Sequence, residues 1–270
     1  MYNHIPVKIL RTIALLLGWL VLLYAAMEAI FSGRILYFLP ELDPLYGMGF
    51  GILITWLSIE RIHPEGYKFF GIFLGFSILA GYIFPLLGAL GFLLTVFVLW
   101  FFRDPERSPP SHDCIVSPAD GVICKIDCMS PPEECNLEDK NFLRICIFMN
   151  VFNVHVNRSP TNALIKDIIY VKGKFFNASL DKASKDNERN ILVLENHKSE
   201  TLVVVQIAGL IARRILSFVK PAESLSIAER FGLIRFGSRV DVYLPTDYVT
   251  DLEEGTKVVA GQSIIARAAS

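Results

Sequence analysis

The feature that most restricts the fold is the run of residues 69–102, which contains no charged side chain. A single helix of that length would exceed the ~30 Å hydrocarbon thickness of a bilayer. Pro85 and Gly88 lie near its middle, and proline ends or kinks a helix. We therefore expect two short helices that meet at 85–88. This hairpin either re-enters the membrane on one side or crosses it twice.

Positive side chains flank this run at both ends, namely Arg61, Lys68, Arg103 and Arg107. Positive charge beside an apolar segment marks the cytoplasmic side of a membrane. The five cysteines form no C-x-x-C pair, and their odd number suits a reducing compartment. We expect a protein of the cell membrane, with its globular part on the cytoplasmic side and no metal site.

Two further apolar segments precede the hairpin. Residues 12–31 are interrupted only by Glu28 and approach the ~20 residues that span a bilayer. A signal peptide is the competing interpretation, but no small-x-small cleavage site closes the run, so we expect a membrane helix. Residues 46–59 are shorter and suit a short, buried or interfacial helix. The region 1–102 is thus expected to be helical and membrane-associated.

Residues 103–270 have the composition of a globular domain and are rich in short β-like runs. These runs are 114–116, 121–126, 143–149, 164–171, 191–194 and 201–207. The sequence also predicts an exposed excursion at 174–190, a short helix at 226–231 and a closing hairpin at 255–265. The fold class is α+β, with N-terminal hydrophobic helices followed by a β-rich catalytic domain. A net charge of −1 argues against nucleic-acid binding.

The segment 238–244 alternates with the period of a half-buried strand and ends at Pro245. Ser238 points to the same face as the core valines, and Gly237 before it can adopt unusual backbone conformations. A glycine–serine bond at an inward-facing strand start can bring a hydroxyl onto the preceding carbonyl. An ordinary glycine turn is the simpler alternative.

Two other residues have the chemistry to assist such a hydroxyl. Asn153, His155 and Asn157 share one face of an expected strand. His155 has the chemistry of a general base; the alternative is that this strand face is simply exposed to solvent. Asp120 lies in an Asp-Gly turn. Its carboxylate has the chemistry to orient a histidine; the alternative is that Asp120 only forms a hairpin turn. A serine hydrolase uses these groups, but the Gly-x-Ser-x-Gly signature is absent. Attack by Ser238 on the carbonyl of its own chain is the other use.

Four motifs occur in order at 101–109, 117–121, 154–158 and 236–241. Together they resemble the proenzyme of the phosphatidylserine decarboxylase family, in its short membrane-associated form. The resemblance runs from about residue 57 to the end of the chain. It implies self-cleavage between Gly237 and Ser238, which gives a large chain, 1–237, and a small chain, 238–270.

The resemblance also implies a cofactor, a pyruvoyl group generated from Ser238. It gives His155 the role of removing the Ser238 proton and Asp120 the role of orienting His155. Phosphatidylserine in the lipid bilayer would be the substrate, decarboxylated through a Schiff base to phosphatidylethanolamine. The longer family branch has a second histidine where this chain has Phe152, so the proton donor is His155 acting twice or a water held by an asparagine.

Three rival functions follow from the same residues. A related serine phospholipid such as archaetidylserine would serve the same chemistry. A membrane-anchored β-rich binding module would leave the chain uncleaved and indifferent to Ser238→Ala. A membrane serine hydrolase would keep an intact chain with a Ser238 that reacts with phosphonates.

Overall fold

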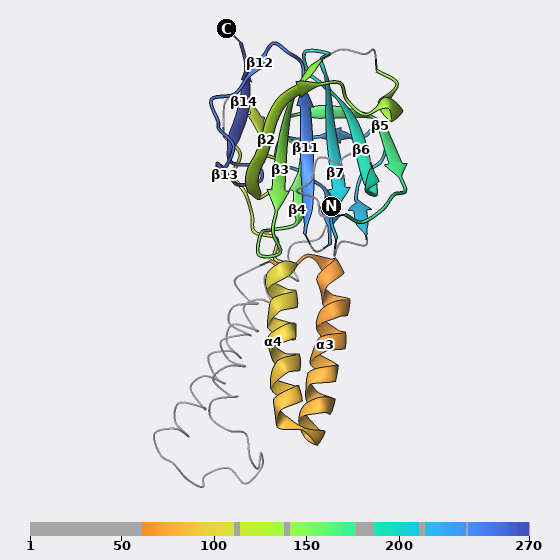
Figure 1. Ribbon diagram of the computed structural model, residues 1–270, viewed down its shortest axis with the longest axis vertical. Coiled ribbons are helices and arrows are strands. Elements are labelled where there is room, and N and C mark those ends of the chain that lie inside the picture. Colours follow the sequence, from red (N-terminus) through yellow and green to blue (C-terminus); the bar gives the residue numbers. More distant parts are fainter. Residues whose placement is uncertain are drawn as a thin grey trace. The chain divides into compact units, whose positions relative to one another are not determined.

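The computed structural model describes residues 61–110, 114–137, 141–176, 186–210, 214–235 and 237–269. The chain divides into two compact units, one ending at Glu106 and the other beginning at Arg107. Figure 1 shows a helical first unit and a β-rich second unit. The helices expected at 12–31 and 46–59 lie outside the described residues.

The first unit contains two helices, α3 (Pro64–Ile83) and α4 (Pro85–Phe101), which run side by side in Figure 1. Each begins with a proline, whose missing N–H costs nothing in the first turn of a helix. Phe84 between them is extended and turns the chain. The joint lies where the uncharged run predicts it, although α3 begins at Pro64 rather than at 69. Within the described ranges, neither helix combines the length and apolarity needed to cross a membrane.

Small residues hold α3 and α4 close together. A Cβ atom on Gly88 would lie 2.4 Å from the Cα of Gly81, and Ser77 Oγ donates to the Gly88 carbonyl at 2.8 Å. Many of the large apolar side chains, by contrast, are exposed. Leu79 and Leu86 are 71% and 73% exposed. This much apolar surface is unusual for a protein face in water.

The second unit is β-rich, which confirms the fold expected for this part of the chain. Its strands are β1 (Ile115–Val116), β2 (Gly121–Met129), β3 (Phe142–Met149), β4 (Val156–Arg158), β5 (Ala163–Val171), β6 (Arg189–Asn196), β7 (Thr201–Ala208), β8 (Ile215–Ser217), β9 (Ser224–Leu225), β10 (Arg230–Ile234), β11 (Ser238–Leu244), β12 (Tyr248–Val249), β13 (Lys257–Val258) and β14 (Ile264–Ala268), with a 3₁₀ turn at Glu133–Cys135. Among the described residues, eight strands form one antiparallel sheet in the order β13-β2-β3-β11-β7-β6-β5-β9. Two three-stranded sheets, β1-β14-β12 and β4-β10-β8, complete the unit.

β11 lies in the interior of the large sheet, between β3 and β7 (Figure 1). Its bounds match the expected strand, and Val240, Val242 and Leu244 join the main hydrophobic core. The expectation of a half-buried strand was wrong, because Arg239 and the other residues of its second face are buried too. A second apolar cluster lies on that face; it contains residues of β3, β6 and β7 and Tyr243 of β11, and Cys135 and Leu137 pack against it.

Two local expectations near the C-terminus were also wrong. The segment 226–231 is a turn followed by β10, because Glu229 accepts a hydrogen bond from the Ser226 N–H and Phe231 is drawn fully into the core. β13 and β14 do not pair with each other. They pair instead with β2 and β1, so the segment 255–265 joins two sheets rather than forming a hairpin.

Candidate active site

Ser238 begins β11 at one end of the large sheet. It is paired with Met149 of β3 on one side and with Ala208 of β7 on the other. Its side chain is fully buried, and its Oγ has no hydrogen-bond partner among the described residues. A buried polar atom without a partner costs free energy, and such atoms are rare in native proteins. This hydroxyl therefore has a better explanation in reactivity than in stability.

Gly237, immediately before it, has a φ of +72°, in the left-handed region that favours glycine. A Cβ atom at this position would meet nothing within 4 Å. The requirement for glycine is therefore conformational rather than steric. The Gly237 N–H donates to Nε2 of His155 at 3.3 Å, so an imidazole lies against the backbone of the residue before Ser238.

The sheets explain how two residues so distant in sequence come together. β4 begins one residue after His155 and pairs with β10, which ends just before Gly237. The N–H of Ile234, at the end of β10, donates to the carbonyl of His155 at 3.3 Å. The connection from β10 to β11 therefore passes beside His155.

The residues before His155 form a turn, so the strand expected across 153–157 was wrong in its first half. Asn150 Oδ1 accepts from the N–H of Phe152 at 2.9 Å, and Asn153 Oδ1 accepts from the N–H of Asn150 at 2.9 Å. Asparagine side chains commonly replace ladder hydrogen bonds in this way and favour turns over strands.

The hydrogen bonds of His155 assign its tautomer. Nδ1 lies 2.9 Å from the carbonyl oxygen of Asn153, which only accepts, so Nδ1 carries the proton. Nε2 accepts from the Gly237 N–H and is therefore the unprotonated nitrogen of the ring. The ring is 0% exposed, which excludes the solvated strand face considered above. A buried neutral imidazole whose Nε2 lies against Gly237, one residue before Ser238, has the chemistry of a proton acceptor.

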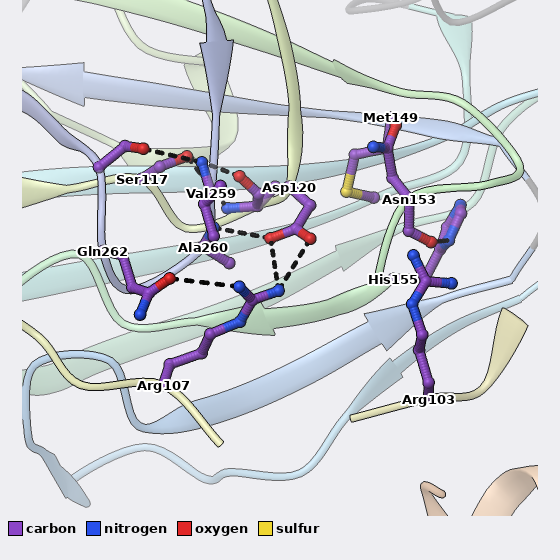
Figure 2. A network of polar contacts seen from close by, with 12 residues as sticks. Arg103, Arg107, Ser117, Asp120, Met149, Asn153, His155, Val259, Ala260 and Gln262 are labelled. Carbon is purple, nitrogen blue, oxygen red and sulfur yellow. Dashed lines mark hydrogen bonds and ion pairs between the residues drawn. The ribbon is translucent and has the colours of Figure 1, made fainter. Parts of the chain in front are cut away.

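Asp120 is buried, but its carboxylate does not contact His155 in the structure. Arg107 Nη2 lies 3.0 Å from Oδ2 and 3.3 Å from Oδ1, and the N–H of Ala260 donates to Oδ1 at 2.8 Å. Figure 2 shows this group, with Gln262 beside Arg107, apart from the pair formed by Asn153 and His155. Both partners of the expected Asp120–His155 hydrogen bond are thus engaged elsewhere.

The contacts of Asp120 join the turn at 117–121 to the segment 259–263. Ser117 adds two backbone hydrogen bonds, donating to Ser263 and accepting from Gly261, each 2.8 Å long. Gly121 fits because a Cβ there would lie 2.2 Å from the carbonyl oxygen of Phe148. Sequence reasoning missed Arg107 as a partner, since it interpreted this arginine only as a membrane flank.

A chain of buried amides lies on the same face of the sheet as Ser238. Gln206 Nε2 donates to Asn157 Oδ1 at 2.8 Å, and Asn190 Nδ2 donates to Gln206 Oε1 at 2.9 Å. Asn157 and Gln206 are both 0% exposed. Gly232 makes room for them, because a Cβ there would lie 2.7 Å from Gln206 Nε2. These amides fix β4 against β7 and so hold the segment that carries His155.

The opposite face of β11 carries a buried ion pair that the sequence pattern did not reveal. Arg239 Nε and Nη2 donate to the two carboxylate oxygens of Asp241 at 2.6 and 2.7 Å. Burial lowers the pKa of Arg239, but the hydrogen bond and the charge of Asp241, together with the neighbouring thiols Cys146 and Cys124, outweigh it, and the pKa is raised. Burial also raises the pKa of the neighbouring Cys146 thiol. All five cysteines are free.

Comparison with known proteins supplies a family for this geometry. The sequence model of the family described as phosphatidylserine decarboxylase matches residues 94–266. A protein of Ruegeria pomeroyi named phosphatidylserine decarboxylase proenzyme is 49% identical over 209 residues. The match covers 77% of this chain and 95% of that protein.

Proposed function

Because this chain belongs to the phosphatidylserine decarboxylase family, we propose that it is a proenzyme that cleaves itself between Gly237 and Ser238. The mature protein then decarboxylates phosphatidylserine to phosphatidylethanolamine. The observation that carries the proposal is a buried Ser238 hydroxyl without a partner, one residue from the N–H that His155 Nε2 accepts.

Self-cleavage needs a base and an acid, and His155 is the candidate for both. His155 Nε2 takes the Ser238 hydroxyl proton while Oγ attacks the carbonyl carbon of Gly237. The protonated imidazole returns that proton to the departing backbone nitrogen, so the peptide bond becomes an ester. Loss of the Cα proton of residue 238 then expels the Gly237 carboxylate and separates the two chains. Asn153 supports the first step, since its carbonyl stabilises the imidazolium through Nδ1–H.

The pyruvoyl group fits the position that Ser238 occupies. Hydrolysis of the dehydrated residue consumes one water and releases one ammonia, and leaves a ketone at the start of the small chain. At this position a pyruvoyl group would supply a ketone for the substrate amine and an acceptor for the electrons released as carbon dioxide leaves. The surrounding strands β3 and β7 keep that position fixed and dry, because Met149 and Ala208 are both 0% exposed.

A lipid substrate accounts for the apolar hairpin, and we place the protein at the cytoplasmic face of the cell membrane. α3 and α4 present apolar side chains to their surroundings, and Trp100 at the open end lies under the Arg103 guanidinium at 4.2 Å. An aromatic side chain beside a cation is typical of a membrane–water interface. Insertion of the hairpin from its tip at Phe84 keeps both of its ends on one side.

The test of self-cleavage is the intact mass of the purified full chain beside a Ser238→Ala variant. Conversion to a pyruvoyl group predicts fragments of about 27 and about 4 kDa from the 30.4 kDa chain, whose masses sum to about 1 Da above it. Ordinary proteolysis at the same bond adds about 18 Da instead. A single uncut wild-type chain would refute the proposal.

The test of sidedness uses the exposed Cys128 of the β-rich unit. A membrane-impermeant maleimide should label Cys128 in inside-out membrane vesicles. It should not label Cys128 when it is added to the outer side of an unbroken cell membrane. A Cys128→Ser variant gives the background from the other thiols. Labelling from the outside would refute the cytoplasmic placement.

A further inference from the structure

Two exposed apolar side chains lie at the end of the sheet that carries Ser238. Phe152 is 64% exposed and Leu210 is 67% exposed. They follow Met149 and Ala208, the two residues that pair with Ser238 from either side. The chain therefore leaves the sheet at two points beside the proposed site. At each point a large, exposed apolar side chain follows within three residues of the residue that pairs with Ser238.

The exposure of Phe152 is held by the turn that carries it. Side chains of Asn150 and Asn153 accept backbone hydrogen bonds within residues 150–153, which fixes the position of the residue between them. The carbonyl of Asn153 at the same time accepts the proton of His155 Nδ1. One rigid turn thus directs a polar group into the site and an aromatic ring out of it.

The charge around these loops is mixed. Arg214 is exposed, and its carbonyl accepts the N–H of Arg235 at 3.2 Å, so these two arginines lie side by side, whereas the acidic Glu188 accepts the N–H of Ala208 through its carbonyl at 2.9 Å. Apolar side chains combined with cations are the composition that binds anionic lipid surfaces.

We propose that Phe152 and Leu210 form an interfacial rim that enters the surface of an anionic phospholipid bilayer beside the site. The proposal rests on the proposed function, because a lipid headgroup must reach position 238 while its acyl chains stay in the bilayer. The apolar pair enters the boundary between headgroups and chains, and Arg214 contacts lipid phosphate. The rim brings the site to the lipid rather than drawing the lipid into water.

Depth in the membrane can be measured without any catalysis. Phe152→Trp and Leu210→Trp are made in the full-length Ser238→Ala chain and reconstituted into phosphatidylcholine–phosphatidylserine vesicles with brominated acyl chains. Val249→Trp is the matched control, because Val249 is 51% exposed and follows the opposite end of β11. The parent chain gives the background from the three native tryptophans.

We expect bromine to quench the fluorescence added at 152 and 210 by about twofold or more and to leave that at 249 unchanged, since quenching requires contact with the chains. Equal quenching at all three positions overturns the proposal. So does a blue-shifted but unquenched signal at 152 and 210, which would mean that protein rather than lipid covers the rim.

Kinetics separate this proposal from the proposed function. The double variant Phe152→Ser, Leu210→Ser should lose about tenfold in kcat/KM on phosphatidylserine vesicles relative to its kcat/KM on a monomeric short-chain phosphatidylserine. Equal losses on both substrates overturn the rim. A wild-type chain that is cleaved but releases no carbon dioxide from either substrate would instead refute the decarboxylase activity, and the quenching result would stand by itself.

Discussion

Replacing Asp120 by asparagine distinguishes two roles for this carboxylate. If Asp120 holds Arg107 and Ala260, as the structure shows, asparagine removes the charge that attracts Arg107 but keeps an oxygen for the Ala260 N–H. If Asp120 instead orients His155 during self-cleavage, asparagine removes the group that stabilises the imidazolium. The two roles predict very different losses.

The magnitude of the first effect follows from the contact with Arg107. The side chains of Arg107 and Asp120 are 15% and 13% exposed, and their shortest contact is 3.0 Å. A charged hydrogen bond in such a setting contributes about 1.5–3 kcal/mol, so loss of the pair slows cleavage by at most about 10–100-fold. Loss of the orienting carboxylate of a catalytic triad costs about 10⁴-fold.

The assay is the rate at which the fragment 238–270 appears after synthesis, measured by intact mass. Arg107→Met should slow cleavage to the same extent as Asp120→Asn, and the double variant should be no slower than either single variant, because both remove one interaction. A loss of about 10⁴-fold in Asp120→Asn, with Arg107→Met close to wild type, would refute this role and restore the contact with His155.

Three further outcomes are expected. Asp241→Ala should destabilise the purified chain by about 3–5 kcal/mol in thermal unfolding, because it leaves the buried charge of Arg239 unpaired. The double variant Arg239→Met, Asp241→Leu should recover most of that stability. An equal loss of stability in the two variants would contradict this prediction. The hydrogen bond from Arg144 lowers the pKa of Asp127, so the folded pKa of Asp127 lies below its unfolded value near 3.9. The contribution of Asp127 to stability is therefore present above that unfolded value and is lost as the pH falls through the folded pKa. The melting temperature of Asp127→Asn should therefore lie below that of the wild type at pH 7 and converge with it below about pH 3, and a gap that does not depend on pH would exclude this linkage. Burial raises the pKa of Cys135 to about 11, so iodoacetamide at pH 8 should alkylate the exposed Cys128 well before Cys135, as peptide mass spectrometry will show.

Strand positions were predictable where alternation met a clear stop. The segment 238–244 ends at Pro245, and its inward residues belong to the core as expected. The burial of its other face was not predictable, since Arg239 and Asp241 read as solvent-facing until their mutual neutralisation is known. An alternating polar pattern shows only that the two faces of a strand differ. Whether the polar face is buried as well depends on long-range contacts that the local sequence does not reveal.

The candidate site divides in the same way. The roles of Ser238 and His155 were predictable only through the four ordered motifs that resemble a known family, because an ordinary glycine turn and a solvated histidine explain each residue equally well by itself. The partners of those groups are not visible, since they are backbone atoms or distant side chains. The carbonyl of Asn153 has no residue signature, and Arg107 is paired through a fold that brings 120 and 260 together.

The interior position of β11 sets the order in which this protein can be made. The proposed cut at its first residue would leave a small chain that is hydrogen-bonded to neighbouring strands on both sides, so the small chain would not dissociate as a separate subunit. The large piece alone would present two raw strand edges, on β3 and β7, which attract other chains. Folding must therefore be finished before the cut, and halves synthesised separately should aggregate rather than reassemble. Cleavage would therefore be irreversible, because the two products could not refold together into the same molecule.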